Sequence, residues 1–253
     1  MKTHKTLSLI YGLTAVTAMW YLAGLLLGFR LIPAPHTVFA IFWKITISGQ
    51  LLLHGAASLL RLGAGMILAL LLGVPIGILT GISRKMDRLF SPVVYILYPL
   101  PKIAFLPVFM LLFGLGDLSK ILLLLSVILF QIILAARDGV KEIPRELHIA
   151  SRTLRMSRHD LFFRLYLPSA LPRLFSALRI SVGIGIAVLF FAENYATTYG
   201  LGYFVMNSWV MINYPLMFAG IMALGISAAL VLALLDRIQR ITCPWLDAGD
   251  KET

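Results

Sequence analysis

Long apolar stretches separated by short charged segments run through the 253-residue sequence and constrain its fold more than any other feature. Hydrophobic residues make up 60% of the chain and charged residues only 13%, a more apolar balance than soluble domains have. A bilayer core about 30 Å thick needs roughly 20 apolar residues in a helix. The apolar windows therefore predict an all-α membrane protein, a polytopic helical bundle of about six transmembrane helices at residues 7–28, 59–82, 92–114, 119–137, 176–197 and 216–236.

The distribution of Lys and Arg predicts the orientation of these helices. If the N-terminus lies inside, the inner side receives the basic residues at both ends of the chain, those at 84–88 and the series from 137 to 179. The outer side keeps only Arg30, Lys44, Arg61 and Lys120. Because cytoplasmic loops retain an excess of Lys and Arg, we expect both termini in the cytoplasm. The first apolar run is too long for a signal peptide, which indicates an uncleaved anchor.

A stripe of small residues in the second predicted span indicates close helix packing. Gly65, Gly73, Gly77 and Gly81 share one helix face, because each is a multiple of four residues from the next. Small residues let a second backbone approach closely in membranes, and direct substrate contact is the alternative. Pro75 lies off the stripe and predicts a kink.

The third predicted span is interrupted by Pro99, Pro101 and Pro107, with Lys102 among them. A continuous helix through these prolines is not expected, and broken backbone at membrane depth needs surrounding protein or a water-filled cavity to satisfy its polar groups. The segment is thus expected to face the inside of the assembly. The alternative is a reoriented helix start near the cytoplasmic interface, with Lys102 reaching water.

Glu193 follows an apolar run and is adjacent to Asn194 in the fifth predicted span. An intramembrane carboxylate needs a partner, a cavity or a proton. Lys102 is a possible partner, and Arg179 is a poorer one because it lies about 21 Å away along the helix. Lys102, Glu193 and Asn194 form a candidate translocation path, against the alternative that Glu193 holds helices together or lies near the outer interface.

A charged segment, residues 138–173, separates the fourth and fifth predicted spans. Its sequence predicts a helix over residues 145–156, a second short helix capped by Ser157 and ended by Pro168, and a new membrane helix opened by Pro172. The second helix has an apolar side made of Leu161, Phe162, Leu165 and Leu167. A helical hairpin with cationic and apolar faces is typical of a docking element.

The charged segment resembles the cytoplasmic loop of the membrane-spanning permease subunits of bacterial ATP-binding-cassette importers. That loop carries Glu-Ala-Ala, three residues, Gly, nine residues and Ile-x-Leu-Pro, and every spacing is preserved here. The matching positions are Ile149, Ala150, Ser151, Arg155, Leu165, Leu167 and Pro168. The chain departs from the pattern with Ile149 for Glu, Ser151 for the third-position Ala and Arg155 for Gly, which looks like a turn residue in the family.

Further motifs along the chain are similar to the nitrate, sulfonate, taurine and bicarbonate branch of these permeases. They include residues 31–35, His54, Ser58, Arg61, residues 73–77, 101–107, 113–116, Ala192 with Glu193, and residues 200–203. The resemblance implies a type I importer permease fold in the bacterial inner membrane. It divides the chain into an N-terminal anchor helix and outer segment (1–58), a permease core with its coupling loop (59–240, loop 138–173) and a cytoplasmic tail (241–253).

The family implies an importer built from two permeases, here expected to be a homodimer, with two cytoplasmic ATPases and an extracytoplasmic binding protein. The sequence has no Gly-x-x-x-x-Gly-Lys-Ser/Thr loop, so we expect ATP hydrolysis by a partner and no catalytic residues in this chain. No cofactor or nucleic-acid partner is expected, and neither the lone Cys243 nor the pair His148 and His159 has metal-ligand spacing. The implied substrate is a small anion such as nitrate, a sulfonate or taurine. The alternatives are a heterocyclic vitamin precursor, a membrane-embedded enzyme or a non-transporting scaffold.

Overall fold

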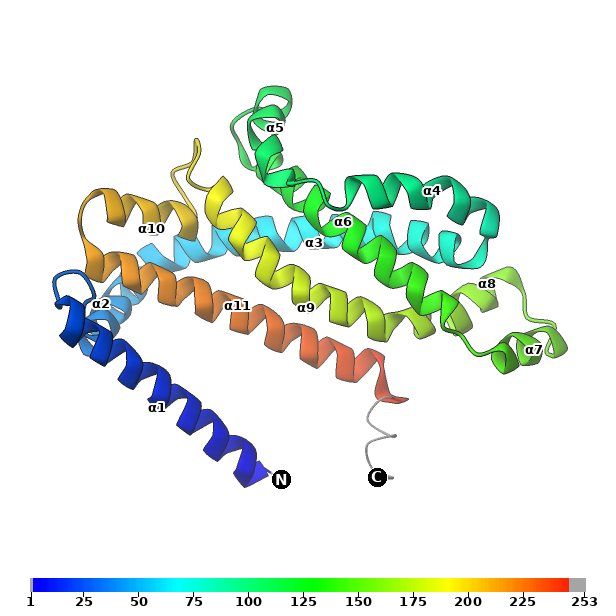
Figure 1. The fold of residues 1–253 in the computed structure, drawn as a ribbon, viewed down its shortest axis with the longest axis horizontal. Helices are drawn as coiled ribbons and strands as arrows, with labels where there is room; N and C mark the ends of the chain where they lie inside the picture. Colours follow the sequence, from blue (N-terminus) through cyan, green and yellow to red (C-terminus); the bar gives the residue numbers. More distant parts are fainter. Residues whose placement is uncertain (1, 246–253) are drawn as a thin grey trace. The chain divides into compact units, whose positions relative to one another are not determined.

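The computed structural model describes the backbone of residues 2–245 and the side chains of residue 7 and residues 11–245. Every regular element in this described part is helical, which confirms the all-α prediction (Figure 1). Residues 246–253 of the expected tail lie outside the described residues. The described chain forms two compact units, and two long helices each contribute to both: α3 (Gln50–Ile82) and α11 (Tyr214–Thr242).

The first unit combines the described residues up to Ser58 with Thr197–Ile226. It contains α1 (Lys2–Leu27), α2 (Pro35–Ile47), α10 (Leu201–Val210) and parts of α3 and α11. Pro35 opens α2, where a missing backbone N–H costs no helical hydrogen bond. Seven buried side chains make its core: Val38, Ile45, Leu51, Leu201, Phe204, Ala219 and Ala223.

Side chains of α3 fix the turn that precedes α10 in this unit. Nδ1 of His54 lies 3.1 Å from the backbone N and O of Gly200, and Leu201 N donates to Ser58 Oγ over 2.8 Å. Gly200 has φ +140°, a conformation that glycine adopts without a Cβ clash. His54 and Ser58 therefore tie a sharp turn to the α3 helix.

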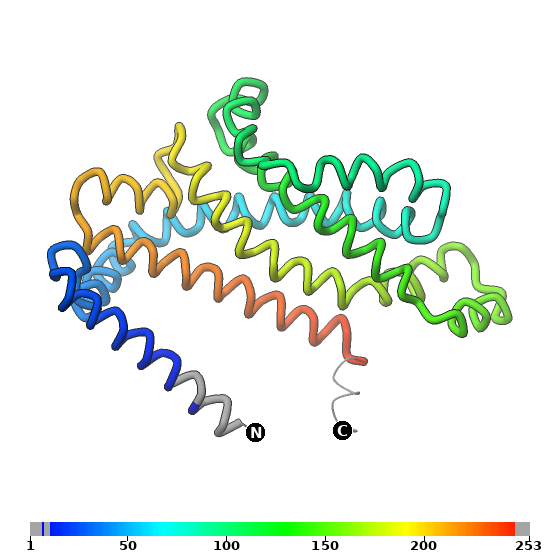
Figure 2. The backbone as a smooth tube through the Cα atoms, in the orientation of Figure 1, coloured from blue at the N-terminus to red at the C-terminus, as the bar shows by residue number. Residues whose placement is uncertain are grey.

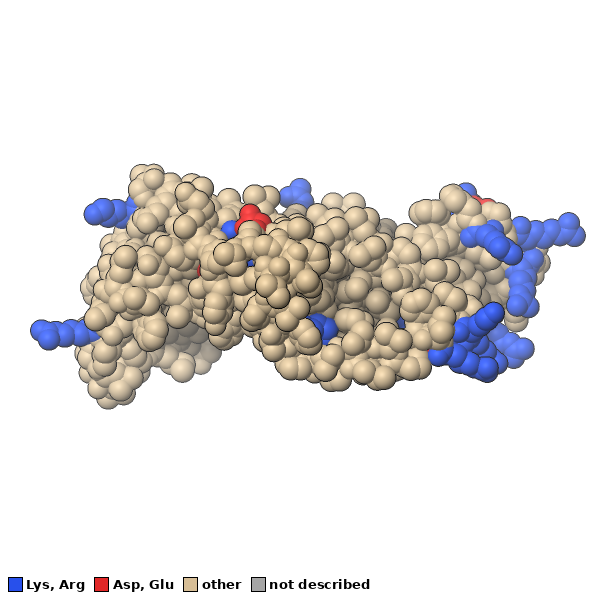
Figure 3. Space-filling view, turned by 90° about the horizontal axis from the view of Figure 1, so that it is seen from above, with Lys and Arg blue, Asp and Glu red and all other residues tan. Residues whose placement is uncertain are grey.

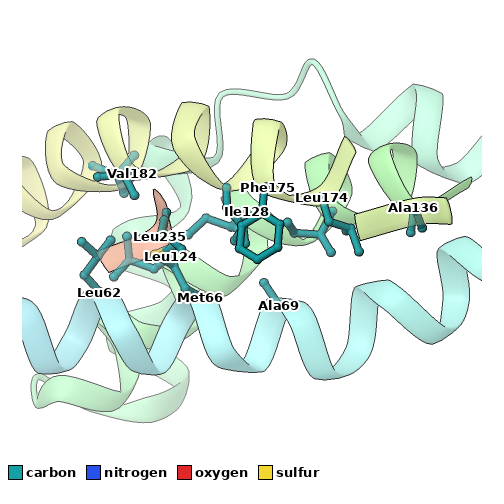
Figure 4. Packing of buried hydrophobic residues seen from close by; sticks show 14 of the residues in the cluster. Leu62, Met66, Ala69, Leu124, Ile128, Ala136, Leu174, Phe175, Val182 and Leu235 are labelled. Atoms are coloured by element: carbon teal, nitrogen blue, oxygen red, sulfur yellow. The ribbon is translucent and has the colours of Figure 1, made fainter. Parts of the chain in front are cut away.

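The second unit contains the rest of α3 and α11 together with the remaining helices. Their bounds are α4 (Arg84–Leu97), η1 (Lys102–Phe105), α5 (Leu106–Phe113), α6 (Asp117–Lys141), α7 (Arg145–Thr153), α8 (Arg158–Asp160), η2 (Leu161–Tyr166) and α9 (Leu167–Ala192). Helix α6 packs along α9, as the backbone trace also shows (Figure 2). Buried side chains of α3, α6, α9 and α11 meet in one core, which includes Met66, Ile128, Phe175 and Leu235 (Figure 4).

The glycine stripe of α3 lies against α6. A Cβ placed on Gly77 would come within 2.5 Å of the Ile133 carbonyl oxygen and 2.6 Å of Ala136 Cβ. The same construction at Gly65, Gly73 and Gly81 meets Leu124, Ile132 and Val140 at 2.7 to 2.9 Å. These distances are too short for a side chain, so the two backbones approach as closely as glycine permits.

Four described helices are long and apolar enough to cross a membrane: α3, α6, the continuous Arg158–Ala192 helix and α11. A fifth span is possible if α4 and the η1–α5 segment count as one, and these bend by 82° at the predicted proline break. Five of the expected six spans thus have counterparts. The first, residues 7–28, falls on α1, where the described residues give a shorter apolar helix, Tyr11–Leu27, and it stays a prediction.

The prediction that Pro168 ends a helix and Pro172 starts another is wrong. Both prolines lie in one continuous helix, Arg158–Ala192. A π-helical turn, η2, precedes Pro168, and Leu167 N donates to Phe162 O at its end, five residues back. Pro168 then falls in the first turn of α9, where its missing N–H is tolerated.

Candidate functional site

The charged segment contains a short helix, α7, that ends in a left-handed turn at Arg155. Arg155 N donates to Arg152 O over 3.0 Å, and Met156 N donates to Ser151 O over 3.1 Å. This pair of hydrogen bonds is the Schellman motif, which places its turn residue at positive φ and usually uses glycine there. Arg155 has φ +48°, so an arginine holds the conformation that explains the glycine of the related loops.

Ser157 starts the next helix, as its position predicts. Its Oγ accepts a hydrogen bond from Asp160 N at 3.1 Å and donates one to Asp160 Oδ2 at 2.6 Å. An N-cap serine satisfies a backbone N–H that has no partner within the helix. The turn between α7 and α8 is therefore fixed at both ends by local hydrogen bonds.

The segment has an anchored side and an exposed side. On the anchored side, Leu165 is buried in the unit's core, Leu167 and Pro168 are half-buried, and Ser151 is buried with its Oγ donating to His148 O at 2.9 Å. On the exposed side, Ile149 is 57% exposed, and Ala150 and Leu154 are also exposed. An exposed apolar helix surface that the adjoining segment anchors to the core is suited to contact another protein.

A buried charge cluster lies at the opposite end of this unit, with Arg61 at its centre. Arg61 Nη1 lies 2.5 Å from Glu193 Oε1, and Arg61 Nη2 lies 2.7 Å from Asp117 Oδ1. The Glu193 side chain is fully buried and that of Arg61 is 5% exposed. The cluster joins α3, the start of α6 and the end of α9, and it supplies the partner that an intramembrane carboxylate needs.

Arg61 is the residue that sequence reasoning missed as the partner of Glu193. Lys102 and Arg179 were considered, but Arg179 binds Asp236 and Gln239 on α11. The signal was present, because Arg61 starts the second predicted span and Glu193 ends the fifth, which places both on the same predicted side. Lys120, also fully buried, lies near the cluster and donates to Leu115 O and Gly116 O.

Lys102 lies at the break between α4 and α5. Its Nζ donates to Leu97 O at 2.8 Å and Tyr98 O at 2.9 Å, and it lies 4.9 Å from the centre of the Phe130 ring. These carbonyls end α4, so the ammonium satisfies groups that the broken helix leaves without helical partners. Lys102 also lines a cavity of about 460 Å³ together with Gln131.

The remaining predicted residue, Asn194, is half-buried and directly follows Glu193. The structure therefore places Glu193 in the buried cluster, with Asn194 next to it in the chain, and it places Lys102 at the helix break with other partners. Across the residues described here, no three His, Cys, Asp or Glu side chains gather as a metal site.

Residues 73–247 match the family described as binding-protein-dependent transport system inner membrane component. The chain belongs to this family. It is 33% identical over 248 residues to the taurine transport system permease protein TauC of Escherichia coli, covering 95% of this chain and 90% of TauC. It is also 28% identical to the formylaminopyrimidine transport permease protein ThiX of Halalkalibacterium halodurans, covering 90% of this chain and 91% of ThiX.

A solved structure supports the fold. A chain of the MetNI methionine ABC transporter, in an inward-facing conformation, superposes with a TM-score of 0.65 over 75% of this chain and 94% of that chain, at 23% identity. The relatives as a group place the chain in the nitrate, sulfonate, taurine and bicarbonate branch of ABC permeases, as its motifs predict. It is thus a multi-pass permease component of the inner membrane.

Proposed function

We propose that this chain is the permease subunit of an ATP-driven importer and that α7 with its following turn docks onto a cytoplasmic ATPase. The observation that carries the proposal is the exposed apolar surface of Ile149, Ala150 and Leu154, on α7 and the turn that follows it. Because residues on either side of this surface, Ile143 and Leu165, are buried in the unit's core, it can transmit a rigid-body movement of the ATPases to the membrane helices. Closure of the ATPases on ATP would then favour one of two permease conformations.

Two further contacts support a rigid link between the docking face and the membrane helices. Leu165 inserts into the core that α3, α6 and α9 share. Arg173 of α9 forms an ion pair with Glu142, which follows α6. A push on α7 would therefore reach α6 and α9 together rather than be lost in a flexible loop.

Replacing Ala150 with Glu tests the docking role. A larger acidic side chain on the exposed face should abolish copurification of the cognate ATPase, while the permease still inserts into the membrane. Ser48→Glu is the matched control, because Ser48 is exposed and lies between α2 and α3, far from α7 in the sequence. Unchanged copurification with Ala150→Glu, or equal loss with Ser48→Glu, would count against the assignment.

We also propose that Lys102, rather than Glu193, contacts the solute on its path. Lys102 lines a cavity at a broken helix, whereas Glu193 is fully buried against Arg61. Broken helices supply backbone polar groups at transporter binding sites. Lys102→Met should lower uptake while ATPase copurification is kept, and wild-type uptake by this variant would remove Lys102 from the path.

The proposed solute is a small organic or inorganic anion of the sulfonate or taurine type. The similarity to TauC supports this choice, and the similarity to ThiX supports a heterocyclic vitamin precursor as the second candidate. The proposed assembly has two copies of this chain, two ATPases that hydrolyse the ATP and an extracytoplasmic binding protein, with both permease termini in the cytoplasm. Measuring which ligand the cognate binding protein binds separates the candidates. A heterocycle bound in preference to taurine would contradict the proposal that the solute is an anion.

A further inference from the structure

A cavity of about 650 Å³ lies at the α7 end of the second unit, separate from the Lys102 cavity. The end of α3, the start of α4, the end of α6 and one face of α7 contribute to its wall. Its cationic lining residues are Arg84, Arg88, Lys141 and Arg152, and His148 lies beside them. In the space-filling view, Lys and Arg side chains gather at the end of the molecule that carries α7 and α8 (Figure 3).

The cavity has more positive than negative charge in its wall. Asp87 is its one lining carboxylate among the described residues, and it already binds Arg137 at 2.7 Å and Lys141 at 2.5 Å. Within residues 11–245, Arg84, Arg88 and Arg152 form no ion pair. Three guanidinium groups therefore line this cavity without a carboxylate partner among those residues.

Lys and Arg are generally abundant on the cytoplasmic side of membrane proteins, but that bias does not explain this arrangement. The bias accounts for the number of cations on the cytoplasmic side but not for their positions, because cations scattered over that side would satisfy it equally well. Here cations from α4, α6 and α7, which are far apart in the sequence, converge on one concave space. Like charges held together in this way repel one another unless an anion joins them.

The two faces of α7 separate this cavity from the docking surface. His148 and Arg152 are four residues apart, so they share one helix face, and both line the cavity. Ile149 and Ala150 follow His148 at about 100° per residue and lie on other faces of α7. The cavity can therefore hold a ligand independently of the contact proposed for the ATPase.

We propose that this cavity binds a phosphate-bearing anion. Guanidinium groups match phosphate oxygens with paired hydrogen bonds, and they remain charged at every physiological pH. The volume is within the range of small-ligand sites and leaves room for a substituent on the phosphate. An anionic phospholipid headgroup and a soluble phosphate compound share this chemistry.

Two binding measurements on the purified full-length chain distinguish these sources. One arm uses nanodiscs of phosphatidylcholine with and without phosphatidylglycerol, and native mass spectrometry counts the anionic lipids kept after mild delipidation. The other arm titrates inorganic pyrophosphate into phosphatidylcholine nanodiscs and follows the thermal midpoint. The test variant is Arg84→Gln with Arg152→Gln. The control is Lys85→Gln with Arg158→Gln, which removes equal charge from positions outside the cavity wall.

Saturable binding in at least one arm, weakened about tenfold or more in the test variant and unchanged in the control, is the expected result. Retained lipid identifies the headgroup as the source, and a pyrophosphate-dependent shift identifies a soluble anion. No binding in either arm, or equal weakening in both variants, would overturn the site. If the double variant does not insert, Arg84→Lys keeps the charge but loses the paired geometry, and it must also weaken binding.

Discussion

At one end of the second unit, Arg61 and Glu193 are almost wholly buried and paired, whereas at its α7 end Arg84, Arg88 and Arg152 surround a cavity and make no ion pair within residues 11–245. Both regions use charged side chains on the same group of helices. The difference is exposure to solvent. A buried charge without a partner is costly, so the first region has to be internally neutralised, while an exposed cation keeps its hydration and remains available to a ligand.

The comparison separates a structural use of charge from a binding use. The buried cluster links α3, α6 and α9 at one point, so its removal should lower the stability of the whole unit. The basic cavity and the apolar face of α7 contribute little to the stability of the fold, so their removal should weaken the binding of partners and ligands. Mutations at the two ends should therefore differ in what they change.

The largest expected effect is that of Glu193→Leu, which leaves Arg61 buried with only Asp117, a 65% exposed side chain, as its carboxylate partner. Loss of one partner from a buried pair costs about 3 to 5 kcal/mol. We expect the free energy of unfolding in mixed micelles to fall by up to this amount, because Asp117 still compensates part of the Arg61 charge. The double variant Arg61→Met with Glu193→Leu should recover most of the loss, because no partly compensated guanidinium remains buried. A double variant as unstable as the single one would contradict the cluster's role.

Helix packing between the two ends should be the next most sensitive feature. Gly77→Ala places a methyl group within 2.6 Å of α6 atoms and should cost about 1 to 3 kcal/mol of unfolding free energy. Gly63→Ala on the same helix meets no atom within 4 Å and is the matched control. Equal stability of the two variants would show that α3 and α6 are not in close contact at Gly77.

A smaller change of opposite sign is expected at the turn after α7. Arg155 holds φ +48°, and replacing it with glycine removes a steric cost of about 1 kcal/mol. Arg155→Gly should therefore raise the thermal midpoint slightly, as measured in detergent. Arg158→Gly is the comparison, since Arg158 lies in a helix and its replacement should lower stability. A lower midpoint for Arg155→Gly would show that the arginine side chain makes a stabilising contact.

The smallest expected effect is that of Arg88→Gln at the basic cavity. Because Arg88 is exposed and has no ion pair in the described structure, the free energy of unfolding should stay within about 0.5 kcal/mol of wild type. The denaturation assay used for Glu193→Leu also measures the free energy of unfolding of Arg88→Gln. A loss comparable to that of the buried cluster would end the distinction between the two regions.

The sequence predicted the features that depend on local pattern. The lengths of the apolar stretches predicted the long helices, and the prolines predicted the break after α4. The spacing to Pro168 identified the loop of the family. Ser157 was predicted as a cap because an N-cap serine acts within three residues. The glycine at the family position equivalent to Arg155 was interpreted as a turn residue, and the positive φ of Arg155 agrees with that interpretation.

Features that depend on contacts between distant segments were harder to predict. Arg61 and Glu193 are separated by 132 positions, and only the packing of α3 against α9 makes them partners. The π-helical turn that lets Pro168 enter a continuous helix leaves no simple mark in the sequence. The basic cavity requires α4, α6 and α7 to be placed together, so its cations were interpreted only as a bias toward one side of the membrane.

Photocrosslinking from Ala150 tests the central claim, that the exposed face of α7 contacts an ATPase. Cys243 is the chain's single cysteine, so Cys243→Ser allows one reactive thiol to be introduced at Ala150 and, as a control, at Ser48. A thiol-attached photocrosslinker on Ala150→Cys should join the permease to the copurified ATPase, with no such adduct from Ser48→Cys. Copurification without an adduct at position 150, or equal adducts from both positions, would contradict the docking of α7.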